Sequence, residues 1–185
     1  MSDVTEWLQA VQRGDALAFG RLFELLYPDL RRIAHARLRG GAQELMNTTV
    51  LVHESFMRLV RLERLAVEDR PRFLAYVAQV MRSIVVDTVR ESRAERRGGG
   101  TPAVPIDTAF ERELAAPEVA HEVLRVHEAL QELQAHDERL VRVVELRYFV
   151  GLEMDEVAQA LGVGKRTAER DWERARLFLF RSLRS

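Results

Sequence analysis

The segment from Leu152 to Arg176 restricts the fold most, because it has the pattern of two short helices joined by a tight turn. The first helix is expected from about Asp155 to Leu161, with apolar side chains on one face and acidic residues at its positive N-terminal end. Gly162 follows directly, and glycine readily adopts the left-handed conformation that ends a helix and reverses the chain. A second helix is expected to begin near Lys165. We therefore predict a helix-turn-helix.

The N-cap residue of each helix and the packing face of the second helix can also be assigned. Glu153 and Gly164 stand at the two N-cap positions, where Ser or Thr is usual. Glycine costs only about a few tenths of a kcal/mol there, so the motif tolerates it. Ala168, Trp172 and Ala175 share a less polar face of the second helix. We expect this face to pack against the rest of the protein.

The second helix also carries concentrated positive charge. Between Gly164 and Ser185, seven basic residues stand against three acidic ones, a net charge of +4. In DNA-binding proteins with this motif, the first residues of the second helix reach base edges in the major groove. We predict DNA contacts at Lys165, Arg166, Thr167, Glu169, Arg170 and Arg174. A helical interaction protein whose arginines only face water would have the same charge pattern.

Composition narrows the classes of function. The 185 residues are 47% hydrophobic and 31% charged, as in soluble globular proteins. There is no cysteine, and the five histidines lack metal-ligand spacing, so we expect no cofactor, metal or disulfide. No apolar run approaches the ~20 residues of a membrane span, and the acidic N-terminus lacks a signal-peptide core. We expect a cytoplasmic protein that does not bind membranes.

Charge and flexibility divide the chain into two parts. Three glycines at 98–100 begin a stretch that contains three prolines and little helical periodicity. Residues 101–122 hold five acidic residues and one arginine, a net charge of −4, whereas the whole chain carries −1. An acidic connector between basic lobes would not collapse onto DNA. We predict a domain at 1–97, a flexible acidic linker at 98–117 and a second domain at 118–185.

Both domains are expected to be all-α, because no strand-like alternation occurs and apolar residues recur at three- and four-residue intervals. Pro28 falls inside one expected helix, where proline favours a kink or a break. Besides the helix-turn-helix, helices are expected at about 4–13, 15–38, 48–62, 71–96, 118–134 and 137–150.

Two further motif blocks precede the helix-turn-helix. The block LVHESFMRL spans Leu51 to Leu59, and PRFLAYVAQVMRSIVVDTVRESRAERRGGG spans Pro71 to Gly100. In this order the three segments resemble the extracytoplasmic-function (ECF) class of bacterial RNA polymerase sigma factors, most closely the branch with LVHE and GGG motifs. The usual pattern of that class has Asp at the position of Val50 and Gln at His53, so this chain departs from it at both positions.

The resemblance implies a transcription initiation factor with no chemistry of its own. Its first domain would bind core RNA polymerase through Leu51, Val52, Glu54, Phe56 and Leu59. The same domain would capture the melted non-template strand of the minus-ten element through Arg72, Tyr76, Arg82, Ser83, Asp87, Arg90 and Arg93. The helix-turn-helix would bind the minus-thirty-five element as duplex DNA. Whether an anti-sigma factor binds the protein is left open.

Two other classes of protein fit part of the pattern. A conventional helix-turn-helix regulator would bind duplex DNA as a dimer, but it would leave residues 1–97 without a role. A helical adaptor would use its arginines only for solubility. Promoter-specific transcription with core polymerase separates these classes from a sigma factor.

Overall fold

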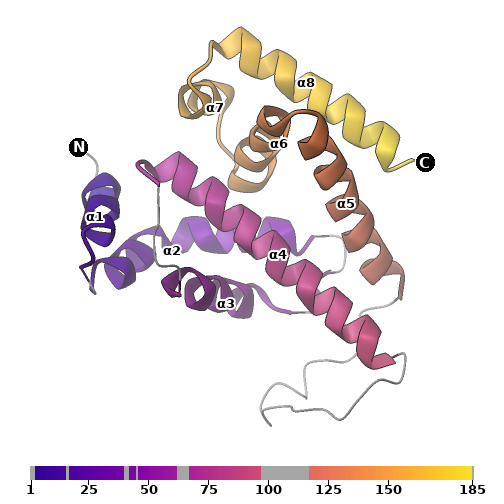
Figure 1. The fold of residues 1–185 in the computed structure, drawn as a ribbon, viewed down its shortest axis with the longest axis horizontal. Coiled ribbons are helices and arrows are strands. Elements are labelled where there is room, and N and C mark those ends of the chain that lie inside the picture. Colours follow the sequence, from indigo (N-terminus) through magenta and orange to yellow (C-terminus); the bar gives the residue numbers. More distant parts are fainter. Residues whose placement is uncertain are drawn as a thin grey trace.

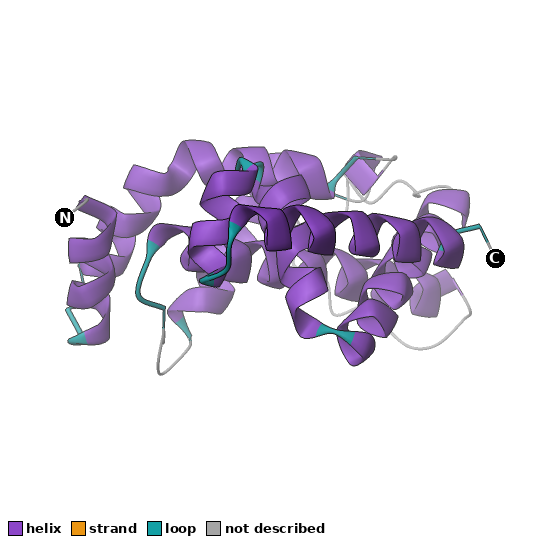
Figure 2. Ribbon diagram, turned by 90° about the horizontal axis from the view of Figure 1, so that it is seen from above, coloured by secondary structure: helices purple, strands orange, loops and turns teal. Residues whose placement is uncertain are grey.

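The computed structural model describes residues 3–15, 17–39, 42–44, 46–61, 67–96 and 117–184. Within these ranges every regular element is helical (Figure 2), so the all-α prediction is confirmed. The N-terminal group consists of α1 (Asp3–Gln12), α2 (Ala18–Arg37), η1 (Ala42–Glu44), α3 (Thr48–Val60) and α4 (Arg70–Arg96). The C-terminal group consists of α5 (Pro117–His136), α6 (Glu138–Val144), η2 (Glu145–Val150), α7 (Met154–Leu161) and α8 (Lys165–Ser182). Most of the predicted linker lies outside the described residues.

Helix α2 passes through Pro28 without a break. Leu22, Leu26 and Leu30 are buried on either side of the proline, so both halves of the helix are held by packing on the core. Pro28 itself is exposed, and water can hydrogen-bond the carbonyl group that the proline leaves without a backbone partner. Of the two outcomes expected at Pro28, a kink or a break, the break does not occur.

Helix α4 lies at the centre of the molecule (Figure 1). Phe73, Val77 and Met81 are fully buried at the four-residue spacing of an apolar helix face. One side of α4 packs on α2 and α3, and another side packs on α5, η2 and α7. One hydrophobic cluster among the described residues therefore runs through both helix groups, and the two groups are docked on each other.

The helix expected at 137–150 is continuous from residue 138 but changes its hydrogen-bond pattern partway. After α6, the chain forms the π-helical segment η2, which ends at Gly151 in the left-handed conformation (φ 81°). A π-helix closes its backbone hydrogen bonds between residues five apart and is wider than an α-helix. Glu145, Leu146, Phe149 and Val150 are buried in this segment.

Among the described residues, no helix combines the length and the hydrophobicity that a membrane span needs.

Candidate nucleic-acid interface

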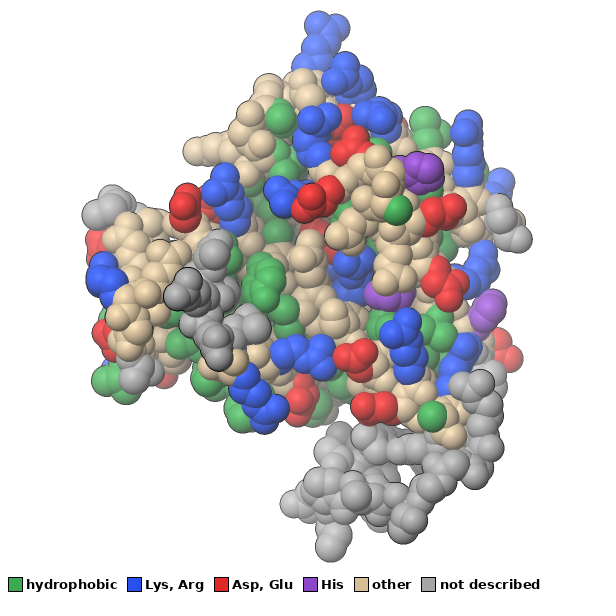
Figure 3. Space-filling view, viewed as in Figure 1, with side chains coloured by type: hydrophobic (Ala, Val, Ile, Leu, Met, Phe, Trp, Pro, Cys, Tyr) green, Lys and Arg blue, Asp and Glu red, His purple; other side chains and the backbone are tan. Residues whose placement is uncertain are grey.

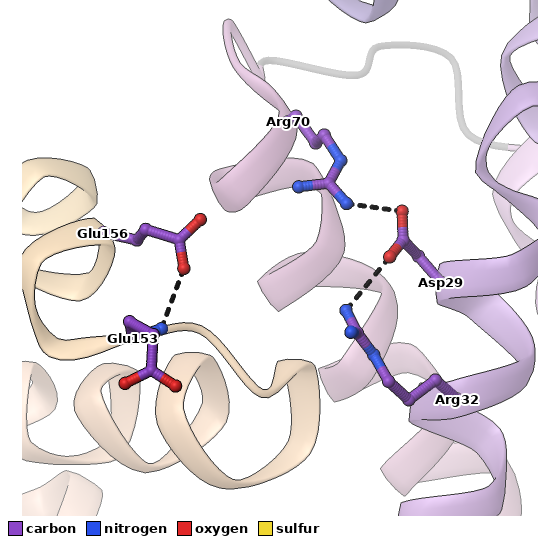
Figure 4. A network of polar contacts seen from close by, with 5 residues as sticks. All are labelled: Asp29, Arg32, Arg70, Glu153 and Glu156. Carbon is purple, nitrogen blue, oxygen red and sulfur yellow. Dashed lines mark hydrogen bonds and ion pairs between the residues drawn. The ribbon is translucent and has the colours of Figure 1, made fainter.

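Helices α7 and α8 meet at a turn centred on Gly162. This glycine has φ 67° and ψ 32°, which confirms the predicted left-handed helix end. The N-caps are Glu153 and Gly164, as expected, and the backbone N–H of Glu153 donates to Oε2 of Glu156 at 2.8 Å (Figure 4). That carboxylate satisfies a backbone donor at the start of α7.

Small side chains set the packing of α8. Ala168 and Ala175 are fully buried, and Trp172 is partly buried against the core, which confirms the packing face predicted for this helix. Because alanine is small, α8 can approach α6 and α7 closely. The opposite face of α8 is consequently fixed in direction and faces water.

The exposed face of α8 is basic at its N-terminal end. Arg166, Glu169 and Arg170 are exposed, and Thr167 is half-buried. Their three- and four-residue spacing places the first three on one face. Figure 3 shows basic side chains, interspersed with acidic ones, along the edge that α8 forms at the top of the view.

Lys165 and Arg174, the outer two predicted contacts, are held by carboxylates of this chain. The ammonium of Lys165 lies 2.8 Å from Oδ2 of Asp155, and this hydrogen bond raises the pKa of Lys165 above its usual value. Arg174 lies 3.5 Å from Asp171 and 3.9 Å from Asp137. Both cations are therefore partly neutralised where they stand.

Asp171 is a structural residue of the motif that the sequence interpretation missed. It is fully buried on α8 and accepts a hydrogen bond from Nε of Arg139 on α6 at 2.7 Å. This hydrogen bond raises the pKa of Arg139. The available signal was its position three residues after Ala168 and four before Ala175, on the buried stripe of the helix.

The start of α4 is fixed by two carboxylates. The side chain of Asp69 accepts from the backbone N–H of Arg72 at 2.8 Å, as an N-cap does. Arg70 contacts Asp29 of α2 at 2.6 Å, and the same carboxylate contacts Arg32 at 3.0 Å (Figure 4). These contacts fix the position of the first turn of α4 relative to α2.

The residues predicted for the minus-ten element do not form one exposed surface. Arg72, Ser83 and Arg90 are exposed at helical spacing on α4. Asp87 pairs with Arg58 of α3 at 3.0 Å. The remaining three are half-buried: Tyr76, Arg82 and Arg93.

Tyr76 and Arg82 face the C-terminal group. Tyr76 and Arg72 line a cleft of about 300 Å³ together with residues of α5, α6, η2 and α7. The side chain of Arg82 is 13% exposed, and its Nε lies 3.8 Å from Oε1 of Glu145 on η2. The docked arrangement thus covers part of the predicted minus-ten surface.

The predicted polymerase-binding helix α3 has a buried and an exposed face. Leu51, Val52 and Leu59 are buried in the core, whereas Glu54 is exposed. Phe56 is half-buried and packs in an aromatic cluster, with its ring centroid 5.4 Å from that of Phe19 and 4.8 Å from that of Phe23.

The exposed face of α3 continues beyond Glu54. His53 is exposed, as is ordinary for a helix residue. Met57 and Val60 are also exposed, at 39% and 51%. A partner that contacts α3 in this arrangement would meet Glu54, Met57 and Val60 rather than the buried leucines.

Comparison with known proteins places the chain in a family. Its whole length, residues 1–185, matches the family model described as ECF sigma factor. Comparison with curated protein sequences gives no significant match. The full-length match agrees with the all-helical fold, and it favours a sigma factor over a conventional helix-turn-helix regulator. The chain therefore belongs to the ECF sigma factor family and directs RNA polymerase to promoters.

Proposed function

We propose that the two helix groups of this sigma factor divide promoter recognition between them. The C-terminal group binds the duplex minus-thirty-five element through α8. The N-terminal group binds core polymerase through α3 and the melted non-template strand of the minus-ten element through α4. The observation that carries the proposal is the basic, exposed face of α8, on a helix anchored from behind by Asp171.

Within α8, we assign base contacts to Arg166 and Arg170. Both are exposed, and they are four residues apart, so both can enter the major groove from one face. Arginine donates two hydrogen bonds to the O6 and N7 atoms of guanine. Lys165 and Arg174 flank this face, and we assign them to phosphate contacts at the edge of the groove, which their carboxylate partners weaken. Glu169 is exposed between these cations and lowers the net positive charge of this face.

Replacing Arg170 with alanine tests this assignment. We expect binding to the correct minus-thirty-five duplex to weaken by about 1 to 3 kcal/mol, and preference at one base position to relax. The matched control is Arg176→Ala, which removes the same charge from a position already paired with Glu173 at 3.2 Å. A loss for Arg170→Ala that is equal for all duplexes, with a shallower salt dependence, would assign this residue to phosphate instead.

Binding of the melted strand involves residues of unequal accessibility. Arg72, Ser83 and Arg90 are exposed in the docked arrangement, but Tyr76 and Arg82 face the C-terminal group. Stacking of a base on Tyr76 therefore requires the two helix groups to separate. The cations of α4 can meet the DNA backbone first, and the aromatic side chain can follow.

Core polymerase supplies the catalytic residues and the metal in this proposal. The protein itself acts in the cytoplasm as a non-enzymatic factor. The motifs LVHE and GGG support its assignment to the branch that carries them. Glu54 is the residue we assign to the polymerase contact, because an exposed carboxylate can pair with arginines of a partner.

A further inference from the structure

A pocket of about 220 Å³ lies where α2, α4, α5 and η2 meet. Its polar wall includes Arg37 at the end of α2, Arg39 just beyond that helix, Arg82 from α4 and His127 from α5. Its apolar wall includes valines of α4 and α5 and the ring of Phe149. Of the residues assigned above to promoter or polymerase contacts, only Arg82 lines this pocket.

The buried charges beside the pocket do not balance. Arg37 and Arg82 share one carboxylate, that of Glu145, which accepts a hydrogen bond from Arg37. Glu145 is fully buried, and the side chains of Arg37 and Arg82 are 4% and 13% exposed. One positive charge is left over in a setting where water cannot screen it. Burial accordingly lowers the pKa of Arg37 to about 10, against the opposing effect of Glu145.

Other titratable groups near the pocket do not remove this excess. Arg39 also lines the pocket and adds a further cation. Glu122 lines it as well, but this residue is exposed, so water weakens its effect on the buried arginines. Burial lowers the pKa of His127, and the charges of Arg82 and Arg90 lower it further, against smaller effects of Glu128 and Asp87. The imidazole therefore stays neutral at neutral pH.

Three residues of the pocket wall also carry buried nitrogens without a hydrogen-bond partner. Nε of Arg37 and Nη1 of Arg82 are buried and have no hydrogen-bond partner among the described residues. Guanidinium groups donate but never accept, so only an acceptor can satisfy these atoms. Nδ1 of His127 is also buried and has no hydrogen-bond partner among the described residues. A neutral imidazole can carry its proton on this nitrogen and donate it. Oε1 of Glu145 is buried and unpartnered as well, but it is one acceptor beside three nitrogens, so excess positive charge and unsatisfied donors still coincide at this pocket.

We propose that this pocket binds a small anion of the phosphate or carboxylate class. Guanidinium groups hold either anion through paired hydrogen bonds, and one negative charge would balance the buried excess. The pocket wall comes from both helix groups, with α2 and α4 on one side and α5 and η2 on the other. A bound anion therefore stabilises the docked arrangement, because a ligand favours the state that binds it.

Thermal unfolding of the full chain, without DNA or polymerase, tests the site independently of promoter recognition. Inorganic phosphate and, separately, acetate replace chloride at constant pH and ionic strength. We expect the midpoint temperature to rise with one or both anions and to reach a plateau. A response to phosphate alone or to acetate alone assigns the site to that class of anion. If the midpoint temperature in phosphate and in acetate is no higher than in chloride, the proposal is overturned.

Variants locate the response. Arg39→Gln changes an exposed residue of the pocket wall, and His127→Leu removes one unpartnered nitrogen while keeping the side-chain volume similar. Each should raise the anion concentration of half-maximal response at least tenfold. Arg31→Gln is the matched control, because Arg31 is an exposed arginine of α2 that does not line the pocket, and it should respond as the parent does. An unchanged response in Arg39→Gln and His127→Leu would place the anion elsewhere and overturn the proposal.

A second measurement applies if a variant fails to fold. In the parent protein, the Nε–H resonance of Arg37 in a ¹H–¹⁵N spectrum should shift on titration with the active anion, over the same concentrations as the thermal response. The backbone resonances of α8 should not follow that curve. Saturation of the thermal response without a shift of the Arg37 resonance would contradict the site.

Discussion

Replacing Glu145 with alanine tests how strongly the buried ion cluster holds the two helix groups together. Glu145 belongs to η2 and is fully buried, whereas its partners Arg37 and Arg82 belong to α2 and α4. The substitution leaves two guanidinium groups buried beside each other without an anion. The ring of Phe149, which lies 3.3 Å from the guanidinium carbon of Arg37, remains as a weaker partner.

The size of the effect follows from burial. Removing one partner of a buried ion pair costs about 3 to 5 kcal/mol, because the other charge stays without compensation. An exposed pair contributes only about 0 to 1 kcal/mol. The side chain of Arg37 is 4% exposed, so we expect Glu145→Ala to lower the free energy of unfolding by about 3 to 5 kcal/mol. Separation of η2 from α2 and α4 would relieve part of this cost by letting water reach both arginines.

Urea unfolding measures the stability, and small-angle X-ray scattering measures whether the groups separate. The control is Glu173→Ala, which removes an exposed pair whose partners are 60% and 58% exposed, and it should cost at most about 1 kcal/mol. The double variant Arg37→Met with Glu145→Leu should recover part of the loss, because apolar groups can replace a buried ion pair. A loss below about 1 kcal/mol for Glu145→Ala, with an unchanged radius of gyration, would refute the role of this cluster.

Two further predictions concern the polymerase surface and the α7–α8 turn. Glu54→Arg should weaken binding to core polymerase at least tenfold, about 1.4 kcal/mol, with unchanged helicity in circular dichroism, and equal affinity of parent and variant would reject this face of α3. Gly162→Ala should destabilise the protein by about 1 to 2 kcal/mol in urea unfolding, because a residue with a Cβ is strained at a φ of +67°. The added Cβ meets no atom within 4 Å, so a steric clash does not contribute. Gly20→Ala, inside α2 and also in open space, should instead stabilise it by about 0.5 to 1 kcal/mol, and the same sign for both alanines would contradict the backbone explanation.

Local patterns predicted the helices because each depends on residues close in the chain. Three- and four-residue spacing identified the buried face of α4, and Gly162 identified the end of α7. The π-helical turn at Glu145 had no such signal, since the same residues continue the apolar spacing of α6. Its partner Arg37 lies 108 residues earlier, and a pairing over that separation cannot be read from periodicity.

The candidate site shows the same limit. The resemblance assigned a whole motif to the polymerase contact, although Leu51, Val52 and Leu59 have the spacing of a buried stripe and are buried. A motif match does not distinguish the residues that pack in the core from the residues that are exposed to a partner. Arg82 was assigned to DNA for a similar reason, but its place beside Glu145 depends on how the two helix groups dock.

In vitro transcription of total genomic DNA from the source organism tests the central claim most directly. Core RNA polymerase is supplied with and without this protein, and the 5′ ends of the transcripts are sequenced. A sigma factor should produce a discrete set of 5′ ends that is absent with core polymerase alone, and these starts should share two upstream sequence elements at a constant spacing. The same 5′ ends with and without the protein would contradict its role in directing polymerase to promoters.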